Sequence, residues 1–334
     1  KNLLSSFSSS MVDRGDFYYR KIRVDDGTSS NVYEGYCISS KKRVAIKIIK
    51  DDYLEQMKNL INIRREINFL VKLKHKFLIK FVGFSISESK NHIWIVSKFI
   101  NNNLYDIKNK LNAFQKTKIA FEIAEGMEYL HQHRIIHRDL KPLNILITKN
   151  LSPKIIDYGF CVTDLNSFTK TDRIGTSNYM APEVIESKPY DRSVDVFSFG
   201  LSLWELYSGN LPYKDISNYS VVSLIVEKKR PEFSDDCPES LKKLIEDCWN
   251  DDPKLRPSFS QIIDRMINEK ISFPENDDAI GFNDNDNNND DDDDECEFNK
   301  IDNEDLPSNE KINLFYEKKH EIRSMNAKIQ GDLD

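Results

Sequence analysis

The middle of the chain reads His137-Arg138-Asp139-Leu140-Lys141-Pro142-Leu143-Asn144, and this segment constrains the architecture more strongly than any other. Pro142 interrupts a regular helix, so we expect a loop here. Asp139 is placed to accept or orient the proton of an incoming hydroxyl group. Asn144, five residues on, offers an amide oxygen that suits magnesium, and Lys141 is placed to neutralise a transferred phosphate.

Two further segments follow this loop. Asp157-Tyr158-Gly159 begins eighteen residues after Asp139, and its carboxylate is suited to bind magnesium. Ala181-Pro182-Glu183 then closes the segment that starts at Asp157. Phosphoryl transfer requires a cation on the phosphates, carboxylates on the metal and a carboxylate beside the attacking hydroxyl group. The order of these residues therefore predicts a phosphotransfer site.

A lysine and a glutamate nearer the start of the chain complete this set. Val44-Ala45-Ile46-Lys47 places a lysine at the end of an apolar predicted strand, and Glu66 lies nineteen residues later on a predicted helix. An ion pair between Lys47 and Glu66 would hold the lysine rigid against phosphate oxygens. Taken alone, Glu66 has an alternative interpretation as a solvated helix residue.

Together these motifs resemble the eukaryotic protein kinase family over about residues 17–270. Cys248-Trp249 and Arg256-Pro257-Ser258-Phe259 resemble the tyrosine-kinase-like group of serine/threonine kinases. The resemblance implies a bilobal α+β fold, with a small antiparallel β-rich N-lobe that has one helix and a larger α-helical C-lobe. It also implies ATP and Mg²⁺ as cofactors, with Mn²⁺ as an alternative metal, and proteins as substrates.

The same resemblance assigns roles to individual residues. The catalytic residues would be Asp139, Lys141, Asn144, Asp157 and Thr176, with Asn144 and Asp157 as metal ligands. The nucleotide would be bound by Gly27, Val32, Ala45, Lys47, Glu66, Ser97, Lys98, Ile100 and Leu146. Among these, Ser97 takes the gatekeeper position, and the backbone of Lys98 and Ile100 would hydrogen-bond the adenine edge. A spine linking the lobes would consist of Leu70, Phe81, His137 and Tyr158.

Other family contacts are implied outside the nucleotide site. Asp195, in Asp195-Val-Phe-Ser-Phe-Gly200, would brace the catalytic loop, and Arg256 would pair with Glu183. The sequence departs from the family at the glycine-rich loop, whose three glycine positions fall on Asp25, Gly27 and Ser30. Because glycines there let backbone N–H groups approach phosphates closely, nucleotide affinity should be weakened.

Specificity for serine and threonine is predicted from two places. Lys141-Pro142 in the loop is typical of the serine/threonine class, and Thr176 is placed to bond Asp139 and Lys141. Dual specificity is the alternative. Arg138, next to Asp139, suggests activation by phosphorylation, through an upstream kinase or autophosphorylation. The candidate positions are Thr163, Ser167, Thr169 and Thr171, with Thr169 and Thr171 favoured, and polar loop residues without a switch are the alternative.

The order of predicted elements, strands first and helices after, indicates two lobes. The expected organisation is a flexible Ser-rich lead at 1–16, the kinase domain at 17–270, an acidic disordered linker at 271–308 and a tail at 309–334. In the tail a short helix is predicted over 309–329, in which Phe315, Ile322 and Ile329, with Ile312 and Met325 nearby, form a seam for docking or pairing. A solvated helix is the alternative.

Charge and composition set the remaining expectations. From Glu275 onward the chain has 20 acidic and 6 basic residues, whereas residues 1–274 carry a net charge of +7. The acidic tail would be an inert solubilising segment, or would fold back on the basic body. Five scattered cysteines fit a reducing compartment, and no run of apolar residues is long enough for a membrane segment. We expect a cytoplasmic protein, or one on the cytoplasmic side of a membrane if a segment precedes Lys1.

Two other functions are compatible with parts of this pattern. A scaffold that binds partners without phosphotransfer is favoured by the incomplete glycine-rich loop and disfavoured by the intact catalytic set. A small-molecule phosphotransferase is disfavoured because Glu183 with Arg256 marks a groove for protein substrates. Nucleic-acid binding has no support beyond the mild basic charge of the body.

Overall fold

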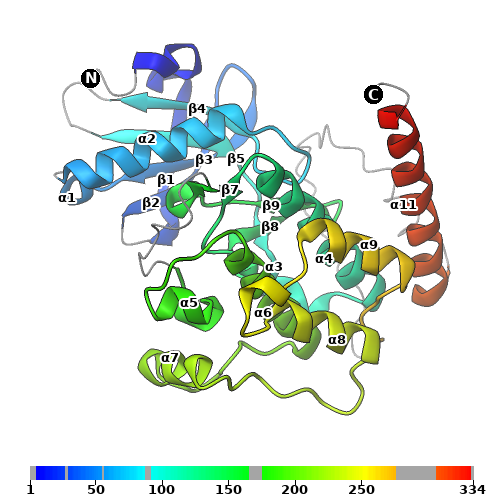
Figure 1. The fold of residues 1–334 in the computed structure, drawn as a ribbon. Helices are drawn as coiled ribbons and strands as arrows, with labels where there is room; N and C mark the ends of the chain where they lie inside the picture. Colours follow the sequence, from blue (N-terminus) through cyan, green and yellow to red (C-terminus); the bar gives the residue numbers. More distant parts are fainter. Residues whose placement is uncertain are drawn as a thin grey trace.

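The computed structural model describes residues 5–26, 29–54, 56–86, 92–164, 175–275 and 306–331 (Figure 1). These residues form two lobes, a small one built on a β-sheet and a larger one built mainly from helices. The chain passes from the small lobe to the large one between Lys98 and Asn102. The predicted bilobal α+β fold is therefore confirmed.

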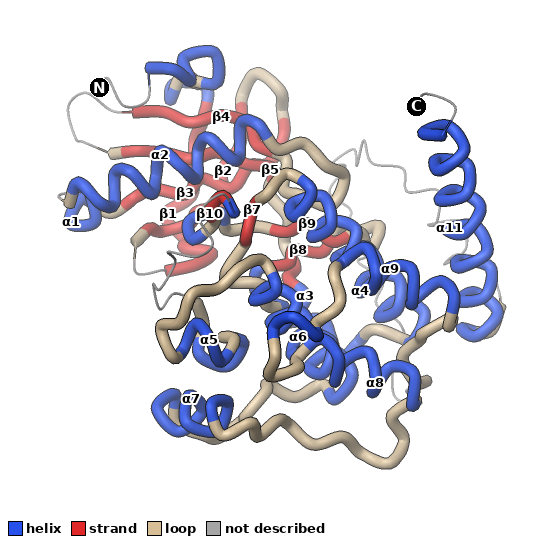
Figure 2. The backbone as a smooth tube through the Cα atoms, in the orientation of Figure 1, coloured by secondary structure: helices blue, strands red, loops and turns tan. Residues whose placement is uncertain are grey.

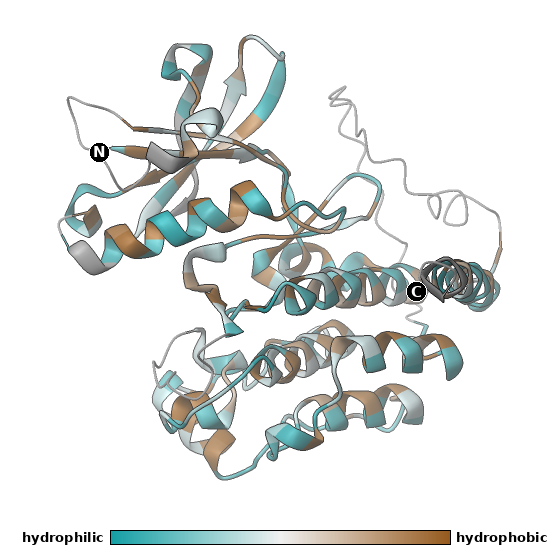
Figure 3. Cartoon of the chain, turned by 45° about the horizontal axis from the view of Figure 1, so that its top comes forward, coloured by the Kyte–Doolittle hydropathy of each residue, from teal (hydrophilic) through white to brown (hydrophobic). Residues whose placement is uncertain are grey.

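The small lobe contains a five-stranded antiparallel sheet with the order β1-β2-β3-β5-β4 (Figure 2). Its strands are β1 (Phe17–Asp26), β2 (Ser30–Cys37), β3 (Lys42–Ile49), β4 (Phe81–Ile86) and β5 (Ile93–Lys98). The connection from β3 to β4 contains the helices α1 (Asp51–Leu54) and α2 (Met57–Lys72). Apolar and polar residues alternate around α2, as expected for a helix that lies on a sheet (Figure 3).

Both faces of this sheet are packed. On one face Val44 and Ile46 of β3 form a small cluster with Val96 of β5. On the other face Ile95 belongs to the main core, together with Ile67 of α2. This alternation follows from the two-residue period of a strand, which points neighbouring side chains to opposite faces. The packing of Ile67 with Ile95 in this core holds α2 against the sheet, and Glu66 is the residue next to Ile67.

The large lobe consists of helices with buried α4 and α6 at its centre. Its helices are α3 (Leu104–Ile107), α4 (Ala113–Gln132), α5 (Pro182–Ile185), α6 (Ser193–Ser208), α7 (Asn218–Val226), α8 (Glu239–Cys248), α9 (Phe259–Asn268) and α11 (Ser308–Gly331). Asn112 and Gln115 form a capping box at the start of α4. Gly209 ends α6 with φ 72°, a left-handed conformation that glycine adopts without strain.

Short strands and 3₁₀ turns lie between the lobes and carry the polar motifs. The strands are β6 (Asn102–Asn103), β7 (Ile135–Ile136), β8 (Ile145–Ile147), β9 (Pro153–Ile155) and β10 (Val162–Thr163). The 3₁₀ turns of the chain are η1 (Ser5–Ser10), η2 (Arg14–Asp16), η3 (Lys108–Lys110), η4 (Pro142–Asn144), η5 (Tyr158–Phe160), η7 (Ser177–Tyr179) and η8 (Pro253–Leu255). Because β7 pairs with β10 and β8 with β9, the loop after β7 and the turn after β9 meet.

The beginning of the chain differs from the expectation of a flexible lead. Met11 forms a parallel bridge with Phe84 of β4, and the Val12 N–H donates to the Phe84 carbonyl at 2.9 Å. Arg14 donates to the carbonyl of His92 at 2.5 Å. Residues 5–16 therefore lie along the outer strand of the sheet. Their serine content concealed this, because backbone pairing leaves no mark on composition.

The tail contains the predicted helix, as α11 (Ser308–Gly331), and this helix docks on the large lobe. On α11, Ile312, Phe315 and Tyr316 are buried against α4 and α9, whereas Ile322 and Met325 are 36% and 63% exposed. The buried positions follow the three- and four-residue spacing of a straight helix, so the predicted seam docks at Ile312 and Phe315 but does not continue to Ile322 or Met325. Of the linker predicted to be disordered at 271–308, residues 276–305 lie outside the described residues. At its start Ile271 and Phe273 are buried in the main core, so the disorder prediction was wrong there. In the described part of the chain, no helix meets the length and apolarity that a bilayer span requires.

Candidate active site

Lys47, Glu66 and Asp157 meet between the sheet and the large lobe. Lys47 Nζ of β3 lies 2.6 Å from Glu66 Oε1 of α2 and 3.6 Å from Asp157 Oδ1. The three come from separate segments, and the packing of α2 on the sheet brings Glu66 within reach. The predicted ion pair is thus present, and the interpretation of Glu66 as a solvated helix residue does not apply.

The charges of this trio depend on one another. Burial alone would lower the pKa of Lys47, but the carboxylates of Glu66 and Asp157 raise it above its ordinary value. Burial would raise the pKa of Asp157, yet Lys47 and His137 lower it below 3.8. Burial raises the pKa of Glu66 despite its cationic partner. At neutral pH the site thus holds a cationic lysine beside an ionised aspartate.

Asp139 is held from four directions. Its Oδ1 accepts hydrogen bonds from the N–H and the hydroxyl group of Thr176, at 2.9 and 2.8 Å. Its Oδ2 lies 2.9 Å from both Lys141 Nζ and Asn144 Nδ2. Lys141 also donates to the Thr176 hydroxyl at 2.5 Å. The predicted contacts of Thr176 with Asp139 and Lys141 are therefore present.

A buried carboxylate fixes the backbone of this loop. Asp195, at the start of α6, is 0% exposed and accepts the N–H groups of His137 and Arg138, each at 2.8 Å. His131 of α4 is its third partner, with Nε2 at 2.9 Å. Burial would raise the pKa of Asp195, but the bonds from His131 and the loop lower it. Because no periodicity set His131 apart from other residues of its helix, we did not single it out from the sequence.

The donor set at Asn144 and Asp157 fits a magnesium ion. Asn144 uses its Nδ2 to donate to the backbone and side chain of Asp139, which leaves its amide oxygen for a metal. Asp157 has a lowered pKa and a side chain that is 32% exposed, so an ionised oxygen faces the space between the lobes. One carboxylate and one neutral oxygen match the hard ligands that magnesium combines with phosphate oxygens.

Three residues predicted to bind the nucleotide, Val32, Ala45 and Ser97, lie on neighbouring strands of the sheet. Ala45 of β3 pairs with Ser97 of β5, and Val32 of β2 pairs with Lys47. Leu146 lies on β8 of the other lobe and is half-buried, like Ile100. The Lys98 N–H already donates to the Lys80 carbonyl at 2.9 Å. Any contact of Lys98 with adenine is therefore left to its carbonyl oxygen.

Two groups of predicted residues are only partly described. Gly27 lies outside the described residues, as do the favoured phosphorylation positions Thr169 and Thr171 and the third candidate, Ser167. The described candidate, Thr163, lies exposed on β10. The pairing of β1 with β2 shifts register between Tyr19 and Arg23 and again between Arg23 and Asp25.

The proposed spine crosses between the lobes at Tyr158. The His137 and Tyr158 rings meet edge to face with centroids 6.1 Å apart. The Tyr158 hydroxyl donates to the Ile155 carbonyl at 3.2 Å, so the change from the usual phenylalanine adds one local hydrogen bond. Leu70 is buried and Phe81 half-buried in the same core. Plain core packing accounts for these contacts equally well.

The side chain of Arg138 makes two hydrogen bonds within the unphosphorylated chain. Its Nε donates to the Phe160 carbonyl at 2.6 Å, and its Nη1 donates to the Tyr190 hydroxyl at 3.0 Å. Its backbone has φ 70°, a conformation that is uncommon for a residue with a side chain. Tyr190 escaped the sequence reasoning because it lies 52 residues from Arg138 and outside every motif.

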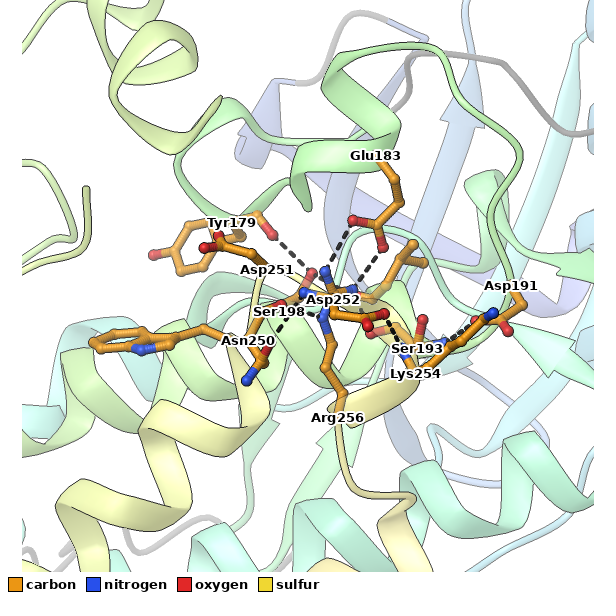
Figure 4. A network of polar contacts seen from close by, with 12 residues as sticks. Tyr179, Glu183, Asp191, Ser193, Ser198, Asn250, Asp251, Asp252, Lys254 and Arg256 are labelled. Carbon is orange, nitrogen blue, oxygen red and sulfur yellow. Dashed lines mark hydrogen bonds and ion pairs between the residues drawn. The ribbon is translucent and has the colours of Figure 1, made fainter. Parts of the chain in front are cut away.

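The Ala181-Pro182-Glu183 segment is anchored to the large lobe by Arg256. The guanidinium of Arg256 contacts both carboxylate oxygens of Glu183, and Figure 4 shows the two side chains pointing toward one another. Arg256 also donates to the carbonyls of Asn250 and Ser193. The predicted pair is therefore present, as part of a larger polar network.

Comparison with known proteins agrees with this geometry. The family model described as the protein kinase domain matches residues 18–266. The chain is 37% identical to the serine/threonine-protein kinase STY17 and 36% identical to STY46, both from Arabidopsis thaliana, over 75% and 73% of its length. It is 33% identical to the dual specificity protein kinase shkD of Dictyostelium discoideum over 82% of its length.

These matches cover 44%, 43% and 36% of the three relatives. The chain thus spans about two fifths of the length of the curated relatives it matches. The matched family model ends at residue 266, and α11 lies beyond it.

Proposed function

The chain belongs to the protein kinase domain family, and we propose that it transfers the γ-phosphate of ATP to serine and threonine hydroxyl groups of proteins. The observation that carries this proposal is the arrangement around Asp139. Thr176, Lys141 and Asn144 hold its carboxylate in one position, while Lys47 contacts the carboxylates of Glu66 and Asp157.

In this proposal each residue has one task. Lys47, held by Glu66, binds phosphate oxygens, and Asn144 and Asp157 would hold magnesium, which when bound would neutralise phosphate charge. Asp139 orients the incoming hydroxyl group, which displaces the Thr176 hydroxyl from Oδ1. The hydroxyl oxygen forms a bond to the γ-phosphorus as the bond to the bridging oxygen of ADP breaks. The hydroxyl proton passes to Asp139, and Lys141 lies beside the phosphate in transfer.

Serine and threonine specificity rests on Lys141-Pro142 and on the Thr176 contacts. Two of the relatives named above are serine/threonine kinases, whereas shkD is named as a dual specificity kinase. We include in the proposal a cytoplasmic location, supported by the free thiols of Cys37, Cys161, Cys237 and Cys248. The proposal also includes activation by phosphorylation at Thr169 or Thr171, through an upstream kinase or by autophosphorylation.

The test is transfer of labelled phosphate from Mg-ATP to a generic basic protein, followed by phosphoamino-acid analysis. Asp157→Asn and Lys47→Ala serve as matched controls, since each removes one group that the proposal requires. We expect transfer that both substitutions abolish, with label on serine and threonine. Label on tyrosine as well would indicate dual specificity. Transfer no greater than in the controls, even after phosphorylation of residues 163–171, would indicate a scaffold without catalysis.

A further inference from the structure

The first described residues of the chain lie beside α2, the helix that carries Glu66. Figure 1 shows the dark blue start of the chain next to β4, and η1 lies against both β4 and α2. Through the Met11–Phe84 bridge and the Val12 hydrogen bond, this segment adds to the free edge of β4. We call residues 7–14 the edge segment.

Gly83 shows how closely this segment approaches the sheet. A Cβ atom at Gly83 would lie 2.3 Å from Val12 Cγ1 and 2.9 Å from the Ser10 carbonyl oxygen. The second of these is a backbone atom, so no change of rotamer could relieve the contact. The edge segment therefore fits only because position 83 has no side chain.

Two further contacts fasten the edge segment at its ends. Phe7 is half-buried and packs on the main core, to which Ile63 and Ile67 of α2 belong. At the other end the Arg14 guanidinium lies 4.4 Å from the centroid of the Trp94 ring and donates to His92 and Ser85. The segment thus joins α2 to the β4–β5 hairpin.

The attachment of α2 to the sheet determines the position of Glu66. At its start α2 lacks a side-chain cap, because Gln56 makes no capping hydrogen bond. Packing must therefore hold this helix where Glu66 reaches Lys47 at 2.6 Å. A displacement of about 1 Å at such a pair can lower a catalytic rate on the order of 100-fold.

From these contacts we infer that Phe7 and the edge segment are positioning elements that hold α2 where Glu66 pairs with Lys47. This inference rests on the proposed kinase activity, because Lys47 acts on ATP. The edge segment touches no reacting atom, and its effect passes through Glu66. Its removal should lower kcat about tenfold and leave KM for the protein substrate unchanged.

The test compares Phe7→Ala in the native background and in Glu66→Gln. We expect about a tenfold loss of kcat in the native background and no further loss in Glu66→Gln, where the pair is already broken. Phe7→Leu should restore most of the rate, and Ser9→Ala, an exposed change in the same segment, should have no effect. Equal losses in both backgrounds, or no loss at all, would overturn the inference.

A second variant and a second readout separate this inference from the proposed function. Gly83→Ala should displace the edge segment, reproduce the effect of Phe7→Ala and add nothing to it. Amide hydrogen exchange in residues 60–70 should accelerate in both variants and not in Ser9→Ala. If the native chain transfers no phosphate, the proposed function fails, and unchanged exchange in Phe7→Ala would separately refute the positioning role.

Discussion

Arg256 donates to both carboxylate oxygens of Glu183, at 2.6 and 2.9 Å, although the residues lie 73 positions apart. Both side chains are buried, and the Arg256 guanidinium also lies 5.0 Å from the centroid of the Phe197 ring. A bidentate pair of this kind fixes orientation as well as distance. It joins the end of the segment after Asp157 to the turn that precedes α9.

Removal of the cation from this pair should be strongly destabilising. Arg256→Met leaves the buried Glu183 carboxylate without a partner, and we expect a loss of about 3–5 kcal/mol in the free energy of unfolding. Urea unfolding followed by fluorescence measures it. The control is Arg265→Met, because the ion pairs of Arg265 with Asp247 and Glu269 are partly solvated and should contribute at most about 1 kcal/mol.

A double variant of Arg256 and Glu183 tests whether the unpaired carboxylate causes this loss. Adding Glu183→Gln to Arg256→Met removes the stranded charge and should recover part of the lost free energy of unfolding. Equal stability of the single and double variants would contradict the view that the unpaired carboxylate causes the loss.

Asp195→Asn should damage the loop that contains Asp139. An asparagine has one accepting oxygen, so its amide N–H₂ would face one of the N–H groups of His137 and Arg138. We expect a loss on the order of 2–4 kcal/mol in the free energy of unfolding, with a large fall in phosphate transfer. Urea unfolding and the transfer assay measure the two effects.

The pH dependence of this loss follows from the lowered pKa of Asp195. A group with a lowered pKa stabilises the fold above its ordinary pKa of 3.8 and loses that contribution as the pH falls through its folded value. The difference between Asp195→Asn and the native chain should therefore be full at pH 7 and shrink below 3.8. A constant difference across that range would contradict the prediction.

His75 should make the fold sensitive to mild acid. Burial, and next the nearby Lys76, lower the pKa of His75 from 6.5 to about 4, and its ring stacks on Tyr129 at 4.7 Å. Because the unfolded chain binds the proton first, stability present above 6.5 is lost as the pH falls toward 4. With solvent screening allowed for, the loss should be about 1–2 kcal/mol. The urea midpoints of unfolding at pH 7 and pH 4.5 measure this loss of stability. The His75→Phe substitution should make the stability depend less on pH between these two values.

Phe315→Ala should destabilise the large lobe without touching the site. Phe315 is 0% exposed, and its ring meets those of Phe114 and Phe121 edge to face, at 6.1 and 5.4 Å. We expect a loss of about 3–5 kcal/mol in the free energy of unfolding. Met325→Ala on the exposed side of the same helix should change it by less than about 0.5 kcal/mol. If the two variants unfold alike, α11 is not part of the folded lobe.

Most of the site could be predicted because its residues are tied to local motifs. Asp139, Asn144 and Asp157 lie in short loops whose residue types follow directly from the chemistry of phosphate and metal binding. The ion pair of Lys47 with Glu66 was harder to predict from the sequence, since it depends on how α2 lies on the sheet. A family resemblance supplied that geometry, which spacing alone did not contain.

The features that escaped prediction are long-range packing contacts. Phe7 and Val12 lie in a Ser-rich segment, and the packing of Phe7 on the core and the bond of Val12 to β4 follow only from the folded arrangement. His131 and Tyr190 meet Asp195 and Arg138 across 64 and 52 residues, with no motif around either. On α11, apolar residues occur at both three- or four- and seven-residue spacings, so sequence alone did not show which face would be buried.

The docking of α11 has a consequence for the order in which this protein can fold. Lys319 pairs with Glu125, which is 194 residues nearer the start of the chain. At ordinary rates of translation, roughly 10–40 s pass between the synthesis of these two residues. During that interval the aromatic face of α4 around Phe121 has no α11 to cover it. The catalytic residues, of which Thr176 is the last, are all made within this interval, so the whole site is synthesised before α11 can cover that face of α4.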